Sequence, residues 1–228
     1  MKRWLVIRPA WPPLSFRVRA GVPAICLLLA LFIFGVLIIH IAVGEFTIPP
    51  LAVLDTLLGN GSRQYNFIVL DLRLPRALVA ILVGMALATS GAILQGLTRN
   101  PLATPDVIGI SQGASLAAVS VIILFSAAPA SLIPPIAFVG ASLAALLVYW
   151  LAWQRGSSPT RLLLTGIGLA AVAYALIEIL MATTQIIRVS QAIVWLAGSV
   201  YGRSWQHLLA LLPWVVIFLP LALLLTRH

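Results

Sequence analysis

Residues 72–119 read LRLPRALVAILVGMALATSGAILQGLTRNPLATPDVIGISQGASLAAV, and this stretch decides the fold. It contains a charged entry, an uncharged apolar segment over Ala77–Thr98, a proline-rich turn and a second segment rich in glycine and serine. At 1.5 Å per residue, Ala77–Thr98 forms a helix of about 33 Å, which is long enough to cross a bilayer. Small residues at every fourth position leave one face of this helix nearly bare, which favours close helix packing in lipid: Gly84, Ala88, Ala92 and Gly96.

The composition of the chain is that of a membrane protein. Of its 228 residues, 62% are hydrophobic and 8% are charged, and the mean hydropathy is +1.12. Soluble domains are about half apolar and about a quarter charged. The net charge of +9 has no basic stripe, aromatic platform or zinc-ligand spacing beside it, so no nucleic-acid partner is expected. The single cysteine, Cys26, excludes an intramolecular disulfide.

Six apolar segments are long enough to be membrane spans, and we therefore predict an all-α fold, a polytopic transmembrane helix bundle. Residues 1–20 form a basic tail and residues 21–228 form the membrane domain. The first span follows a positively charged start, as a secretory signal would, but it exceeds the roughly 7–15 apolar residues of a signal core, so we expect it to be retained. The predicted spans are residues 21–43, 77–98, 107–128, 133–153, 162–181 and 208–225.

Lysine and arginine residues indicate how these spans are oriented. With a cytoplasmic N-terminus, more basic residues lie inside than outside, as the positive-inside rule requires. The inside residues are Lys2, Arg3, Arg8, Arg17, Arg19, Arg99, Arg155, Arg161 and Arg227, and the outside residues are Arg63, Arg73, Arg76, Arg188 and Arg203. We therefore expect a multi-pass protein with a cytoplasmic N-terminal tail.

Four sequence blocks resemble those of a known family. They are LRLPR (72–76), GMALATSGAILQGLTRNPLATPDVIGISQGAS (84–115), LTGIGLA (164–170) and VWLAGSVYGRSW (194–205). In this order they resemble the permease subunits of iron–siderophore ABC importers, the FecCD and vitamin B12 permease-like family, and most of all its ferric-citrate branch. The resemblance implies roughly ten spans, so the six predicted here indicate a chain truncated at its C-terminus.

The resemblance implies a transport subunit and not an enzyme. Such a permease carries a ferric siderophore chelate, here of the ferric citrate kind, across the bacterial inner membrane. The implied partners are a second permease subunit, identical or paralogous, cytoplasmic ATPase subunits, a periplasmic or lipid-anchored substrate-binding protein, the chelate and membrane lipid. No cofactor, metal site or catalytic residue is implied, and the ATPase hydrolyses the ATP.

Other functions stay open as alternatives. The same scaffold would suit another cargo, such as vitamin B12 or haem, and a truncated permease would be non-functional. An integral membrane enzyme is the alternative from a different class. The sequence has no HExxH motif, paired intramembrane carboxylates or Cys/His set that such an enzyme would need.

Two arginines flank Pro75 at the predicted outer mouth of the second span. Pro75 suits the first turn of a helix, where its missing N–H would have no intrahelical partner. Guanidinium groups at such a rim hold carboxylates in charge-assisted hydrogen bonds. The resemblance implies that Arg73 and Arg76 receive glutamates of the binding protein. The alternative is that both are interfacial anchors that reach lipid headgroups.

The predicted inner connection between the second and third spans is a rigid turn. Pro101 and Pro105 prevent a continuous helix, and Asn100 before a proline favours an extended or turn conformation. Asp106 follows at a position where its carboxylate would cap the third helix.

Polar residues within the predicted spans are candidates for the translocation path: Gln95, Ser111, Gln112, Ser115 and Glu178. Hydroxyl and amide side chains in a span either hydrogen-bond across helices or face an aqueous path. Glu178 is the one acid within a predicted span, near the outer end of the fifth. It either lines the path or pairs with Arg188.

Overall fold

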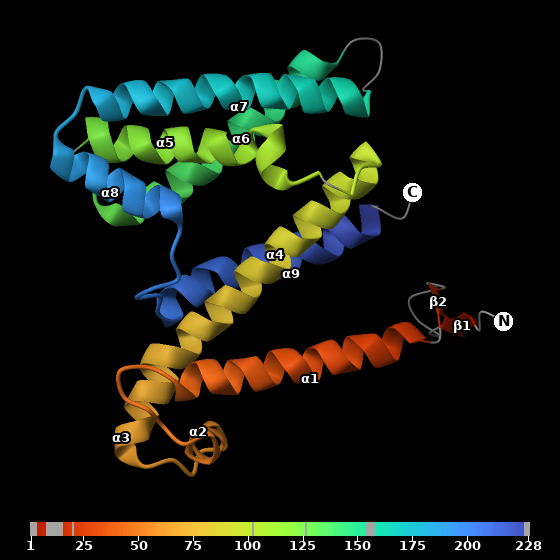
Figure 1. The fold of residues 1–228 in the computed structure, drawn as a ribbon, viewed down its shortest axis with the longest axis vertical. Coiled ribbons are helices and arrows are strands. Elements are labelled where there is room, and N and C mark those ends of the chain that lie inside the picture. Colours follow the sequence, from red (N-terminus) through yellow and green to blue (C-terminus); the bar gives the residue numbers. More distant parts are fainter. Residues whose placement is uncertain are drawn as a thin grey trace. The chain divides into compact units, whose positions relative to one another are not determined.

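The computed structural model describes residues 4–7, 16–19, 21–101, 103–125, 127–153 and 158–225 (Figure 1). The chain divides into two compact units. Unit 1 comprises residues 1–79 and 202–209, and unit 2 comprises residues 80–201 and 210–228. Five of the basic residues that were assigned to the inside lie outside the described residues: Lys2, Arg3, Arg8, Arg155 and Arg227.

Unit 1 begins with a short hairpin and a long apolar helix. Strands β1 (Trp4–Ile7) and β2 (Phe16–Arg19) pair antiparallel within the segment that was expected to be only a tail. In helix α1 (Gly21–Ala42) every residue from 21 to 36 is exposed, and the mean hydropathy reaches 3.1. So large an apolar surface fits contact with lipid and not with water.

A small apolar core lies at the C-terminal end of α1. The elements around it are α2 (Pro50–Leu57), α3 (Arg63–Asn66), the π-helix η1 (Phe67–Arg73) and the start of α4 (Leu74–Thr98). From α3 to α4 the chain is one helical run of 36 residues. The buried core residues are Ile38, Ile41, Ala42, Ile48, Val53, Val69 and Ala77.

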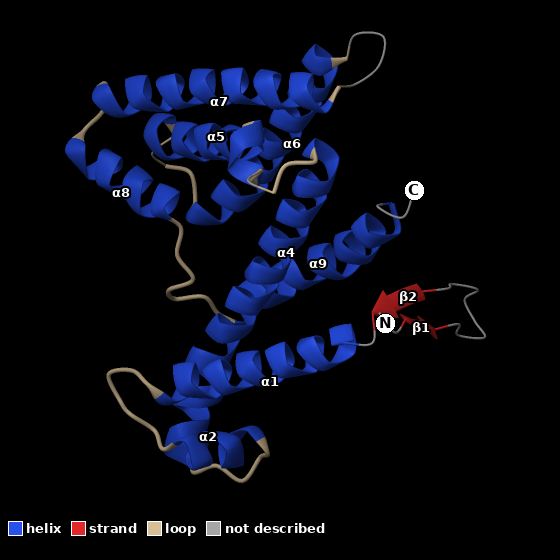
Figure 2. Ribbon diagram, turned by 45° about the vertical axis from the view of Figure 1, so that its right-hand side comes forward, coloured by secondary structure: helices blue, strands red, loops and turns tan. Residues whose placement is uncertain are grey.

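Helix α5 (Ile110–Leu124) is the centre of unit 2. All of its residues from 110 to 123 are buried or half-buried, because α6 (Ile133–Ala152), α7 (Pro159–Ala182) and α8 (Ile186–Ala197) pack around it (Figure 2). The short 3₁₀ helices η2 (Pro105–Ile108) and η3 (Ala130–Leu132) precede α5 and α6.

The last helix, α9 (Trp205–Leu225), begins in unit 1 and continues in unit 2. Within unit 2 it contacts α6 through Phe138 and Trp214, whose ring centroids are 5.0 Å apart. Trp214 also stacks on Phe218 of its own helix, at 5.7 Å. Aromatic pairs at such distances stabilise helix contacts beyond their buried area.

Within the described residues, five helical segments are long and apolar enough to cross a membrane: α1, the run from α3 to α4, α6 with η3, α7 and α9. Helix α5 is shorter than the span predicted over 107–128, with 15 residues. Gly109, with a φ of 77°, separates it from η2, and Phe125 leaves helical geometry at its other end. The all-α transmembrane fold is confirmed, and the small hairpin is an addition to it.

Candidate docking and translocation site

The guanidinium group of Arg73 caps the C-terminal end of α1. Its Nη1 donates to the carbonyl oxygens of Ile41 (2.5 Å) and Ala42 (3.3 Å), and its Nη2 donates to that of Phe46 (2.6 Å). The last carbonyls of a helix have no intrahelical partner and carry partial negative charge, so a guanidinium stabilises them. Gly44 leaves room for this contact, because a Cβ there would lie 2.6 Å from Nη2. Nothing in the sequence indicates this role of Arg73.

Arg76 lies three residues after Arg73, in the first turn of α4. Both arginines are half-buried, and Pro75 between them is fully buried. The structure therefore places the two predicted docking residues within one turn of a single helical run. Docking of a partner carboxylate stays a prediction for both, and for Arg73 it would compete with the carbonyls of α1.

No neighbouring helix among the described residues packs closely on the small-residue stripe of α4. Gly84, Ala88, Ala92 and Gly96 are all exposed. A Cβ built at Gly84 or Gly96 meets no described atom within 4 Å. The close packing predicted for this face is therefore not made by the part of the chain that the structure describes, and it stays a prediction.

The closest packing of small residues lies between α5 and α6. A Cβ at Gly113 would lie 2.8 Å from the carbonyl oxygen of Gly140, and one at Gly140 would lie 2.6 Å from that of Gly113. Both would also meet an alanine Cβ of the facing helix, Ala144 and Ala117 respectively. Small residues four apart on both helices are the signal that sequence analysis missed, because it read Gly113 only as part of a polar segment.

The connection between α4 and α5 bends twice. Arg99 has a left-handed φ of 51° just after the end of α4. The chain then turns at Asn100 and Pro101, where the N–H of Ala103 donates to the carbonyl oxygen of Asn100 (3.1 Å). Pro105 begins η2.

The predicted cap by Asp106 is wrong. Helix α5 begins at Ile110, its N-cap residue is Gly109, and no side chain caps it. Asp106 contributes its backbone carbonyl, which accepts from the N–H of Gly109 at 3.3 Å. Gly109 turns the chain here at positive φ and lies against α7, since a Cβ at this position would be 2.7 Å from the carbonyl oxygen of Gly166.

The candidate path residues lie in three different helices. Ser111, Gln112 and Ser115 are half-buried on α5, whereas Gln95 on α4 and Glu178 on α7 are exposed. The side-chain oxygen of Gln112 is buried and accepts no hydrogen bond from the described residues. Buried polar atoms are nearly always hydrogen-bonded to protein or ordered water. Of the five candidates, only the three residues on α5 are half-buried, and their part in a path stays a prediction.

An open apolar pocket of about 290 Å³ lies between α5, α6 and α7. None of the five candidate path residues lines it. Its wall offers no side-chain hydrogen-bonding group to a polar cargo. The wall includes Gly113 and Leu116 of α5, Gly140 and Leu143 of α6, and Leu169 and Ala173 of α7.

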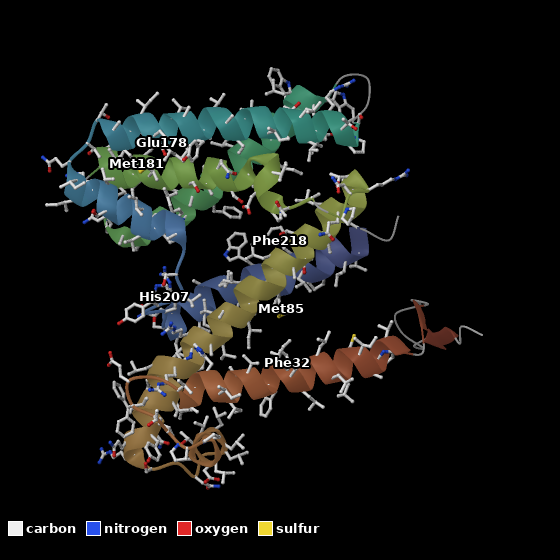
Figure 3. The ribbon with its side chains drawn as sticks, in the orientation of Figure 1. Phe32, Met85, Glu178, Met181, His207 and Phe218 are labelled. Carbon is white, nitrogen blue, oxygen red and sulfur yellow. The ribbon has the colours of Figure 1, made fainter. Side chains whose placement is uncertain are left out.

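Glu178 lies on α7, close to the C-terminal end of that helix (Figure 3), and one turn after Tyr174. The predicted alternative partner, Arg188, instead donates from Nη1 to the carbonyl oxygens of Ile122 and Ile123, both at 3.3 Å. Arg188 therefore caps the C-terminal end of α5, as Arg73 caps that of α1.

Within the described residues, five apolar helices that are long enough to cross a bilayer indicate a multi-pass membrane protein. The model of the FecCD transport family matches residues 27–228. The chain belongs to this family, as its four sequence blocks indicated.

The chain is similar to several transport permeases. It is 43% identical over 199 residues to the achromobactin transport system permease protein CbrC of Dickeya dadantii (strain 3937), covering 87% of this chain and 57% of that protein. It is 42% identical over 199 residues to the Fe(3+)-citrate import system permease protein YfmE of Bacillus subtilis (strain 168), covering 87% and 59%. The chain thus spans less than two thirds of the length of these relatives.

A solved structure has the same fold. It is described as an inward-facing conformation of a metal-chelate type ABC transporter. The TM-score is 0.72 at 25% sequence identity, and the match covers 82% of this chain and 57% of that chain.

Proposed function

We propose that this chain is a transmembrane permease subunit of an ABC importer that carries ferric siderophore chelates, of the ferric citrate kind, across the bacterial inner membrane. The observation that carries the proposal is the family match over residues 27–228, to which the names of the achromobactin and Fe(3+)-citrate relatives add the class of cargo. The chelate crosses intact. The chain is not an enzyme, and a separate ATPase supplies the energy.

The proposed assembly has a second permease subunit, cytoplasmic ATPase subunits and a periplasmic or lipid-anchored substrate-binding protein. The N-terminus lies in the cytoplasm in this arrangement, so that Arg73 and Arg76 lie at the outer mouth. Ser111, Gln112 and Ser115 face the path, and the buried oxygen of Gln112 supports a polar environment there. Gln95 and Glu178 extend the path, which their exposure on α4 and α7 supports.

Uptake of radiolabelled chelates into cells that lack their own permease tests the function. We expect the permease gene, expressed with its ATPase and binding protein, to restore accumulation of ferric citrate well above that of ferric enterobactin, vitamin B12 or haem. Uptake must depend on the binding protein and on ATP hydrolysis. Accumulation of one of the other cargoes alone would replace the proposed substrate. Absence of uptake of every cargo, with a permease gene as long as those of the relatives, would contradict the transport assignment.

Reversal of charge at the proposed docking residues tests the outer mouth. We expect Arg76→Glu, alone or with Arg73→Glu, to lower ATP hydrolysis stimulated by the binding protein at least about 10-fold, because each substitution sets like charges against the partner carboxylate. Basal ATP hydrolysis should not change. Arg63→Glu, an equal change of charge at an exposed residue of α3, is the matched control. Equal stimulation in Arg76→Glu and Arg63→Glu would rule out docking at Arg76.

A further inference from the structure

Pro75 leaves a backbone carbonyl without its helical donor. In the π-helix η1 the hydrogen bonds step back five residues, and at its end the N–H of Leu74 donates to the carbonyl oxygen of Val69. The next bond in this register would run from residue 75 to the carbonyl oxygen of Leu70. Proline has no N–H, so this bond does not form. The carbonyl of Leu70 therefore needs a donor from elsewhere.

Trp205 supplies that donor. Its indole Nε1 donates to the carbonyl oxygen of Leu70 at 3.0 Å, across 135 positions of the sequence. Indole N–H groups are donors only, and the indole of Trp205, which is 38% exposed, uses its N–H for this carbonyl. Trp205 is the first residue of α9, and Ser204 and His207 beside it are joined through the hydroxyl and Nδ1, at 3.0 Å.

We infer that the indole N–H of Trp205 replaces the hydrogen bond that Pro75 cannot donate to the carbonyl oxygen of Leu70. This bond holds the first turn of α9 against η1. The two sequence blocks that contain Pro75 and Trp205, 72–76 and 194–205, are thereby joined by one hydrogen bond. The inference concerns unit 1 alone and does not require the proposed function. In the proposed importer, the same bond would fix the segment that carries Arg73 and Arg76.

A double-mutant cycle tests the inference on the purified full chain in detergent. Trp205→Phe keeps an aromatic ring but removes the N–H, and we expect it to lower the thermal unfolding midpoint by about 2–4 °C. Pro75→Ala restores an N–H that reaches the carbonyl of Leu70. In the Pro75→Ala background, Trp205→Phe should therefore lower the midpoint by less than half as much. Trp150→Phe, at a tryptophan that is 70% exposed on α6, is the matched control.

Two results would overturn the inference. One is an equal effect of Trp205→Phe and Trp150→Phe. The other is an effect of Trp205→Phe that is undiminished in the Pro75→Ala background. If Pro75→Ala does not fold, 3-benzothienylalanine at position 205 makes the same test, because it keeps the size of the indole and replaces its N–H by sulfur. A midpoint equal to that of the wild type would then contradict the role of the N–H.

Discussion

Gly113→Ala and Gly140→Ala are each expected to destabilise the chain by about 1–3 kcal/mol, the usual effect of overpacking. The added methyl group would lie within 2.8 Å and 2.6 Å, respectively, of a carbonyl oxygen on the facing helix. A backbone oxygen of a packed helix cannot rotate away as a side chain does, so α5 and α6 would have to separate. Unfolding in mixed micelles with increasing denaturing detergent, followed by circular dichroism, measures the change.

Gly84→Ala and Gly96→Ala make the matched control. Both are the same chemical change in a spanning helix, but neither new methyl group meets a described atom within 4 Å. Alanine also has the higher helix propensity, by about 1 kcal/mol, so these variants should be neutral or more stable. Equal stability of Gly113→Ala and Gly84→Ala would contradict the α5–α6 contact. Impaired assembly with a second permease subunit in Gly84→Ala alone would place a partner helix on the stripe of α4.

The difference between these two pairs of glycines shows that the sequence predicts the spanning helices but not which of their faces pack together. Hydropathy and length were enough to locate α1, α4, α6, α7 and α9, because lipid requires long uninterrupted apolar helices. Which small-residue face packs closely depends on the neighbour that meets it. The stripe on α4 has the more regular spacing, yet the close contact lies between Gly113 and Gly140. A spacing pattern describes one helix, whereas a contact requires two.

The helix ends show a second limit. The positive-inside rule predicts that Arg73 and Arg188 lie on the outer side, but the sequence indicates a backbone partner for neither. Both donate to the last carbonyls of a helix that ends many residues earlier in the chain, α1 and α5. Backbone carbonyls are the same for every residue type, so their position leaves no signal in the sequence. The cap predicted for Asp106 failed for a related reason, since Gly109 separates η2 from α5.

Loss of the Arg73 side chain is expected to destabilise unit 1 by about 2–4 kcal/mol. In Arg73→Gln the carbonyl of the fully buried Ile41 loses its charged donor, and a buried carbonyl left without a donor costs about 1–3 kcal/mol. The carbonyl of Ala42 keeps the N–H of Ile48 as a donor, at 2.9 Å, and Phe46 is exposed. The favourable interaction of a cation with the C-terminal end of α1 is lost as well. The free energy of unfolding in detergent gives the size of the effect. Arg63→Gln removes the same charge from an exposed site and should change stability by less than about 0.5 kcal/mol.

Gly44→Ala separates the position of Arg73 from its charge. The new methyl group would lie 2.6 Å from Nη2 and would push the guanidinium off the carbonyls, while the arginine itself is kept. We expect a loss of stability of about 1–2 kcal/mol, smaller than that of Arg73→Gln, because the displaced cation still lies near the end of α1. If Arg73 acts in docking only by its charge, Gly44→Ala will keep full stimulation of ATP hydrolysis by the binding protein while Arg73→Gln loses it. If Arg73 acts by fixing the end of α1, both variants will lose stimulation together. Unchanged stability in Gly44→Ala would contradict the capping of the C-terminal end of α1 by Arg73.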